Sequence, residues 1–164
     1  RNPVKPDTAP LLTAYATAKK PRAIFEMGTA YGFSTLHLGL DAPDSKIMSV
    51  EFDPEVAQTA QETLTEAGLE NAVVFPGTVE DAISHLTPDD RFDMVFIDHA
   101  KPLYFPDFQR LEPHLNPGAT VLVDNVNDRR AECQDLVTYL SEGFGAEILP
   151  TQAGLLVAEY YPQR

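Results

Sequence analysis

Short apolar runs alternate along the chain with segments of helical pattern, from about residue 7 to residue 160. Continuous apolar runs of this length are typical of strands that are buried on both faces of a sheet. The predicted strands are Ala23–Met27, Lys46–Phe52, Ala72–Phe75, Phe92–Asp98, Ala119–Asp124, Ala146–Leu149 and Leu155–Tyr160. The helices predicted between them begin after Asp7 and end near Lys20, and then cover Ser34–Leu40, Pro54–Ala67, Glu80–Leu86, Phe105–His114 and Arg130–Phe144.

Specific residues mark the ends of two of these helices. Asp7 is a suitable N-cap for the first helix, and Pro21 ends it. Asp53 stands directly before a proline at the first helical position, and Gly68 occupies the place of a C-terminal glycine. The sequence therefore predicts Pro54–Ala67 most clearly of all the helices.

The alternation of strands and helices predicts an α/β fold. We expect a Rossmann-like, doubly wound, mostly parallel sheet of seven strands with helices on both faces. The last two strands are joined by too few residues for a parallel crossover, so a terminal antiparallel strand is expected. The length of 164 residues and the even composition suit a single domain, which we expect to span residues 1–164.

Charge and composition exclude several classes of partner. The chain has 12 Lys and Arg against 25 Asp and Glu, a formal net charge of −13, which disfavours nucleic acids and anionic membranes. No apolar run approaches the roughly 20 residues that span a bilayer. The single cysteine, Cys133, excludes an internal disulfide and a thiolate zinc cage. We therefore expect a cytoplasmic protein that binds neither nucleic acid nor membrane.

Ligands of such a sheet bind beyond the carboxyl ends of its strands, and polar residues gather there. The first strand leads into Glu26-Met27-Gly28-Thr29-Ala30-Tyr31-Gly32, in which two glycines four apart allow a tight turn beside an anion-binding helix start near Ser34. Glu51 ends the second strand 23 positions after Gly28, close to the interval at which an acid binds a ribose diol. The alternatives are an ordinary strand–helix turn and a solvated strand-end acid. The three-glycine dinucleotide pattern is absent, which counts against a nicotinamide dehydrogenase.

A second polar group follows the fourth and fifth strands, which are neighbours in this topology. Asp98, Asp124 and Asn125 offer two carboxylates and an amide carbonyl, the hard oxygen ligands that Mg²⁺ prefers. Lys101 follows three residues after Asp98, where a neighbouring cation would favour its neutral form and let it act as a general base. The alternatives are that Asp124 and Asn125 cap the next helix and that Lys101 is a solvated surface residue.

Together these residues resemble a known family. The runs Phe25–Ser34, Val50-Glu51, Phe96–Lys101 and Val123–Val126 are similar to those of the catechol and caffeoyl-CoA type O-methyltransferases, which are cation-dependent class I enzymes that use S-adenosylmethionine. The resemblance extends from about Val4 to Tyr160. Its most specific part is the combination of F-[IL]-D-H-x-K with D-N-V.

The resemblance implies a role for each matching residue. Lys101 matches the catalytic base, and the metal ligands match Asp98, Asp124 and Asn125. The residues expected around S-adenosylmethionine are Val4, Glu26, Gly28, Tyr31, Gly32, Ser34, Glu51, Phe52, Val79, Asp98 and His99. The implied reaction is the Mg²⁺-dependent transfer of a methyl group to a hydroxyl of a small catechol-like acceptor.

The acceptor side departs from the family pattern. Ala100 replaces an aromatic residue, Pro102 and Leu103 replace charged ones, and the N-terminal helices that cover the acceptor are reduced to Arg1–Lys20. Such a site either accepts varied vicinal diphenols or needs a second subunit as a lid, so a homodimer is one alternative. The alternative function is a catalytically silent module that binds S-adenosylmethionine or a partner protein.

Overall fold

The computed structural model describes residues 7–162, so the predicted cofactor contact Val4 lies outside the described residues. The strands are β1 Ala23–Met27, β2 Lys46–Glu51, β3 Ala72–Pro76, β4 Phe92–Ile97, β5 Leu115–Val123, β6 Glu147–Leu149 and β7 Leu155–Tyr160. The α-helices are α1 Ala9–Lys19, α2 Phe33–Asp41, α3 Pro54–Glu66, α4 Val79–Ser84, α5 Tyr104–Leu111 and α6 Arg130–Phe144. Two short 3₁₀ helices, η1 Lys101–Leu103 and η2 Glu112–His114, flank α5.

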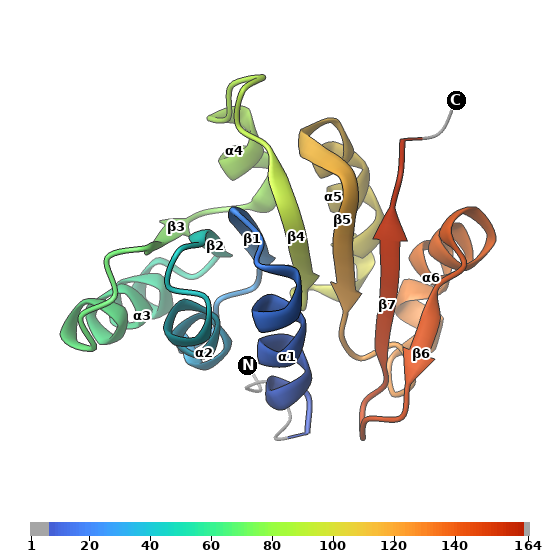
Figure 1. The fold of residues 1–164 in the computed structure, drawn as a ribbon, viewed down its shortest axis with the longest axis horizontal. Coiled ribbons are helices and arrows are strands. Elements are labelled where there is room, and N and C mark those ends of the chain that lie inside the picture. The colour runs from blue at the N-terminus through green and yellow to red at the C-terminus, as the bar shows by residue number, and fades with distance from the viewer. Residues whose placement is uncertain (1–6, 163–164) are drawn as a thin grey trace.

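The strands of the described chain form one seven-stranded sheet in the order β3-β2-β1-β4-β5-β7-β6 (Figure 1). Neighbouring strands from β3 to β5 pair in parallel, whereas β7 runs antiparallel to both β5 and β6. The strand order reverses between β1 and β4, which is the switch point where open α/β sheets bind ligands. The predicted α/β fold, with its antiparallel terminal strand, is confirmed.

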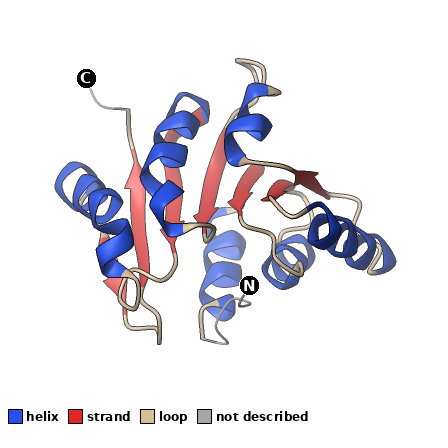
Figure 2. Ribbon diagram, turned by 180° about the vertical axis from the view of Figure 1, so that it is seen from behind, coloured by secondary structure: helices blue, strands red, loops and turns tan. Residues whose placement is uncertain are grey.

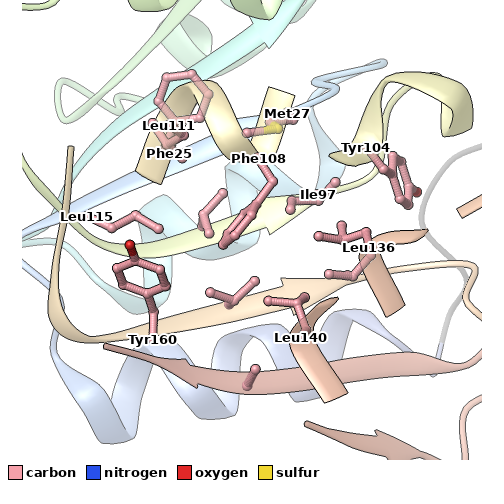
Figure 3. Packing of buried hydrophobic residues seen from close by; sticks show 14 of the residues in the cluster. Phe25, Met27, Ile97, Tyr104, Phe108, Leu111, Leu115, Leu136, Leu140 and Tyr160 are labelled. Atoms are coloured by element: carbon pink, nitrogen blue, oxygen red, sulfur yellow. The ribbon is translucent and has the colours of Figure 1, made fainter. Parts of the chain in front are cut away.

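Alternate residues of each central strand supply two hydrophobic layers. In β4, Met94 and Phe96 join the layer beneath α1, α2 and α3, while Val95 and Ile97 join the layer beneath α4, α5 and α6. Figure 2 shows the second of these faces, and Figure 3 shows its packing, which brings Phe108 of α5 against the sheet. Burial on both faces explains why these strands are continuous apolar runs.

One predicted helix cap is confirmed and the other is wrong. The Asp53 carboxylate accepts hydrogen bonds from the N–H groups of Glu55 and Val56, at 2.9 and 3.3 Å, as an N-cap does. Asp7 caps no helix, because its carboxylate accepts from the N–H of Gln152 at 2.6 Å in the turn between β6 and β7. Thr8 takes the N-cap position of α1, without a side-chain cap bond.

Two predicted boundaries also shift by more than two residues. The segment expected as one helix, Phe105–His114, is α5 followed by η2. Pro113 has no N–H to donate to the preceding turn, so the α-helix cannot continue regularly through it. Strand β5 begins at Leu115 rather than Ala119, and its register with β4 shifts between Phe92 and Met94. These changes lie far from the carboxyl ends of the strands, where the polar residues gather.

Candidate functional site

The backbone brings the three polar strand ends together. Beyond the ends of the strands, the N–H of Gly28 donates to Val50 O at 2.9 Å and the N–H of Asp98 donates to Met27 O at 2.9 Å. The N–H of Asp124 continues this ladder to Ile97 O at 3.0 Å. The first turn, the end of β4 and the end of β5 therefore lie side by side at one edge of the sheet.

Gly28 is required by this close approach. It adopts a φ of +98°, and a Cβ at this position would lie 2.3 Å from the carbonyl oxygen of Asp98. No side chain fits in that space, and a positive φ is also unfavourable for L-residues. The glycine predicted for a tight turn thus also allows β1 and β4 to end against each other.

Glu26, at the end of β1, is fully buried. Its carboxylate accepts hydrogen bonds from the hydroxyls of Ser34 and Thr35, both in α2, and from Ser49 Oγ of β2 at 2.6 Å. Burial raises the pKa of Glu26, and the three hydroxyl donors oppose that rise. The structure thus brings Glu26 and Ser34 together as predicted, and adds two donors that the sequence analysis did not single out.

Glu51 is also fully buried, at the end of β2. Its carboxylate accepts from the N–H of Ala30 at 3.0 Å and from the N–H of Asp53 at 2.9 Å. Glu51 therefore links the turn after β1 to the start of α3. It does not point into solvent, as the alternative of a solvated strand-end acid requires.

The remaining predicted cofactor residues surround this edge in different ways. The side chains of Tyr31 and Phe52 are 46% and 66% exposed. Gly32 has a φ of 87° and stands at the N-terminal end of α2. Val79 begins α4 and is buried, behind a Thr78 side chain that accepts from the N–H of Asp81 at 3.0 Å. Exposed aromatic rings such as those of Tyr31 and Phe52 are suited to stacking on a flat heterocyclic ligand.

Asp98 and Asp124 form the second half of the site, and both are largely buried. Lys101 Nζ lies 3.3 Å from Asp98 Oδ1, and these two side chains are 13% and 14% exposed. Burial and the charge of Asp124 raise the pKa of Asp98 to about 7, although Lys101 lowers it. Burial also raises the pKa of Asp124 to about 6, against the hydrogen bond from the N–H of Asn125. The two acids therefore share an environment that disfavours two negative charges.

Asn125 follows in a left-handed conformation, with a φ of 66°. Its amide nitrogen donates to Asp128 Oδ2 at 3.4 Å. Neither Asp124 nor Asn125 caps α6 through its side chain, because Arg129 occupies that N-cap position. The capping alternative is therefore wrong.

The donor set fits a hard divalent cation by its chemistry. It would combine two carboxylates with an amide carbonyl, and two adjacent buried acids are relieved by a positive ion. Among the residues that the structure describes, no three His, Cys, Asp or Glu side chains group as a metal site. A third ligand beside the two acids would have to be a group of another kind, and the Asn125 amide is the one predicted.

His99 lies in a network that the sequence analysis missed. Its Nε2 is 2.7 Å from Asp107 Oδ2, and Asp107 also binds Arg110 at 2.7 Å. Its Nδ1 is buried and has no hydrogen-bond partner among the described residues. The spacing of three residues between Asp107 and Arg110 in α5 was a signal for the ion pair between them. It gave no signal for His99, which only the tertiary fold brings to that pair.

Tyr104 is the other residue that sequence reasoning missed. It is fully buried at the start of α5, and its hydroxyl donates to the carbonyl oxygen of Asp124 at 3.1 Å. Burial and the neighbouring charges of Asp98 and Asp124 raise its pKa well above the ordinary value, so it stays a donor. An aromatic residue three positions after Lys101 was the only hint in the sequence.

Comparisons with known proteins identify the family of the chain. A family model described as "Methyltransferase domain" matches residues 25–126. A catechol O-methyltransferase from Bos taurus is 32% identical over 142 residues, covering 74% of this chain and 52% of the relative. The chain belongs to the catechol O-methyltransferase-like family of class I methyltransferases. A bacterial member, the catechol O-methyltransferase of Niastella koreensis, is 32% identical over 127 residues, covering 75% of this chain and 58% of the relative.

The solved structures show the same methyltransferase fold. The Bacillus cereus O-methyltransferase in complex with SAH has a TM-score of 0.88 at 21% identity, covering 97% of this chain and 83% of that one. The chain itself spans only 52% and 58% of the two catechol O-methyltransferases above. Among residues 7–162, every helix is too short or too polar to cross a lipid bilayer.

Proposed function

We propose that the chain is an S-adenosylmethionine-dependent O-methyltransferase that needs Mg²⁺ or a similar divalent cation and acts on a small vicinal diphenol. The observation that carries the proposal is the pairing of Asp98 and Asp124, two buried acids with raised pKa values, beside Lys101. Family membership supports the cofactor, since the solved neighbours include a complex with SAM and one with SAH.

The cofactor would lie across the ends of β1 and β2. Glu26 and Ser34 would face its methionine portion, at the start of α2, where free N–H groups favour a carboxylate. Glu51 would hold the ribose hydroxyls, because a carboxylate can accept from two of them at once. Phe52, Val79 and His99 would border the adenine.

Asp98, Asp124 and Asn125 would hold the cation beside the cofactor. When bound, the cation supplies a Lewis acid that lowers the pKa of the reacting hydroxyl of a chelated diphenol. Lys101 is a single positive charge beside two acids, so such an ion would balance the remaining negative charge. Asp98, Asp124 and Asn125 would hold the cation where both hydroxyls of a vicinal diphenol could bind it.

Lys101 would take the proton of that hydroxyl. Its Nζ lies 3.3 Å from Asp98 Oδ1 and 3.0 Å from His99 O, so it stands at the proposed metal ligands rather than in solvent. When bound, S-adenosylmethionine would supply the methyl group for the deprotonated hydroxyl, with S-adenosylhomocysteine as the neutral thioether product. Holding the two reacting atoms in line and excluding water would supply much of the rate.

The proposal extends to the setting of the enzyme. A net charge of −13 and a lone buried cysteine support a cytoplasmic protein without a nucleic-acid or membrane partner, and the family supports a small-molecule acceptor. A homodimer whose second subunit covers the acceptor is part of the same proposal. Size-exclusion chromatography with light scattering tests it, because a monomer that is active on diphenols would contradict the need for a subunit lid.

A methyl-transfer assay over a panel of vicinal and non-vicinal diphenols tests the central reaction. The expected result is methylation of vicinal diphenols that requires added Mg²⁺ and stops in excess chelator. Cofactor binding without turnover on any member of the panel would instead favour a catalytically silent module. Full activity in excess chelator would show that Asp98 and Asp124 hold no essential ion.

A further inference from the structure

Tyr104 has no part in the reaction above, yet it touches three groups of the site. Its side chain is fully buried at the first position of α5, at one margin of the hydrophobic cluster in Figure 3. Lys101 Nζ lies 5.0 Å from the centre of its ring. The His99 ring stacks on it with centroids 5.4 Å apart and an interplanar angle of 18°. Its hydroxyl donates to the carbonyl oxygen of Asp124 at 3.1 Å.

We propose that Tyr104 is a positioning residue that fixes the proposed base Lys101 relative to the proposed cation ligand Asp124. The ring would set the place of the Lys101 amine, and the hydroxyl would set the backbone that presents Asp124 and Asn125. This inference rests on the proposed function and assigns it a residue outside the reacting groups.

The Lys101 side chain, whose amine the Tyr104 ring contacts, is long and flexible. It comes from η1, a turn of three residues, and its amine is held by Asp98 Oδ1 and His99 O. A cation on Asp98 would compete for the carboxylate that now binds the amine. The contact with the Tyr104 ring does not involve a cation ligand, so packing against this buried ring would still limit where the amine can move.

The Tyr104 hydroxyl binds the peptide between Asp124 and Asn125. Asn125 has a φ of 66°, a left-handed conformation that is uncommon outside glycine. Tyr104 binds the carbonyl oxygen of this peptide. The hydrogen bond therefore restrains the orientation of the peptide plane that precedes the left-handed Asn125. The directions of both proposed ligands depend on that plane, because one ligand lies on each side of it.

Mn²⁺ binding, followed by electron paramagnetic resonance, tests the hydroxyl without needing turnover. Tyr104→Phe removes only the hydroxyl, and Tyr139→Phe is the matched control, since the Tyr139 hydroxyl donates at 2.8 Å to Glu112 instead. We expect Tyr104→Phe to weaken Mn²⁺ binding about tenfold, as loss of a group behind metal ligands does, and Tyr139→Phe to change it less than twofold. Equal affinities in Tyr104→Phe and the unaltered chain would overturn this half of the proposal.

A double-mutant cycle tests the ring. We expect Tyr104→Leu to lower kcat at least about tenfold with the KM for S-adenosylmethionine within about twofold. In a Lys101→Ala background, with Mg²⁺ saturating for every variant, the same substitution should lower kcat less than about twofold, because the base it positions is gone. Equal losses in both backgrounds would overturn the proposal and make Tyr104 a structural residue only.

The failure of this inference is distinguishable from failure of the proposed function. An unaltered chain that neither binds Mn²⁺ nor methylates any diphenol would reject the proposed function, and the role of Tyr104 with it. An active unaltered chain with normal Mn²⁺ binding in Tyr104→Phe, and equal losses across the cycle, would reject only the role of Tyr104. Thermal melting of each variant identifies any loss that comes from unfolding.

Discussion

The carboxyl edge of the sheet holds buried acids in two regions, and their charges are accommodated differently. In the first, Glu26 receives three hydroxyl donors, from Ser34, Thr35 and Ser49. In the second, Asp98 receives Lys101 Nζ at 3.3 Å, and burial together with the neighbouring charge of Asp124 raises its pKa to about 7. In the first region, hydroxyl side chains of α2 and β2 satisfy the hydrogen-bonding capacity of the carboxylate. In the second region, one lysine does not balance the charges of two acids.

This difference indicates a different task for each region. A carboxylate that its own fold has already hydrogen-bonded is fixed in place before any ligand arrives, so it can form a rigid wall. Two neighbouring buried acids with one lysine beside Asp98 are costly unless a cation joins them. The first region therefore suits the receiving of an organic cofactor, and the second suits an ion and proton transfer.

Replacing Lys101 should have the largest effect, because it removes the proposed base from the second region. Lys101→Ala is expected to lower kcat about 10²- to 10⁴-fold while cofactor affinity stays within about twofold. Steady-state kinetics and calorimetric titration with S-adenosylhomocysteine measure both quantities. Lys46→Ala, at the exposed start of β2, is the matched control, and an equal kcat in both variants would remove Lys101 from the mechanism.

Glu26→Gln should disrupt the hydroxyl network of the first region. The amide has one oxygen in place of two, so at least one buried hydroxyl of Ser34, Thr35 or Ser49 loses its acceptor. We expect the free energy of unfolding to fall by about 2 kcal/mol. Urea denaturation measures this against Glu66→Gln, which is exposed in α3. Unchanged stability in Glu26→Gln would mean that the hydroxyl network contributes nothing.

Asp98→Asn should have the opposite sign, which sharpens the contrast between the regions. In chelator at pH 8 it removes a buried charge whose pKa is raised to about 7, so we expect a gain of about 1 kcal/mol in unfolding free energy. Asp89→Asn, in an exposed loop, should change stability little. A loss of stability in Asp98→Asn would show that the charge of Asp98 is already compensated within the fold.

The last effect concerns pH. Because the folded pKa values of Asp98 and Asp124 are raised to about 7 and about 6, the folded state holds more protons than the unfolded state above pH 4. Their stabilising contribution is present below the unfolded pKa and is lost as pH rises to 7. The unfolding free energy of the metal-free chain, minus that of Asp98→Asn, should therefore decrease between pH 5 and pH 8. A difference that is constant or rises with pH would contradict the raised values.

Sequence patterns predicted those features that depend on local order along the chain. The apolar runs located the strands, and the topology of a parallel sheet required Glu26, Asp98 and Asp124 to meet at one edge. The Asp53 cap was predictable because its partners follow within three residues. The cap assigned to Asp7 was wrong, because its partner Gln152 lies 145 residues away.

The contacts of the site beyond the strand ends could not be predicted for the same reason. The Asp107 carboxylate reaches His99 only because α5 folds back over the end of β4. The Tyr104 hydroxyl reaches the carbonyl of Asp124, 20 residues further on. Such contacts depend on how a helix packs against a sheet, and no spacing within one element reveals them.

A titration of Mn²⁺ into the metal-free chain at pH 8, followed by calorimetry, tests the central claim most directly. The account predicts one site per chain that is lost in both Asp98→Asn and Asp124→Asn and retained in Asp89→Asn and Glu26→Gln. Absence of a site in the unaltered chain, or a site that survives both substitutions, would contradict the claim that the ends of β4 and β5 share a cation.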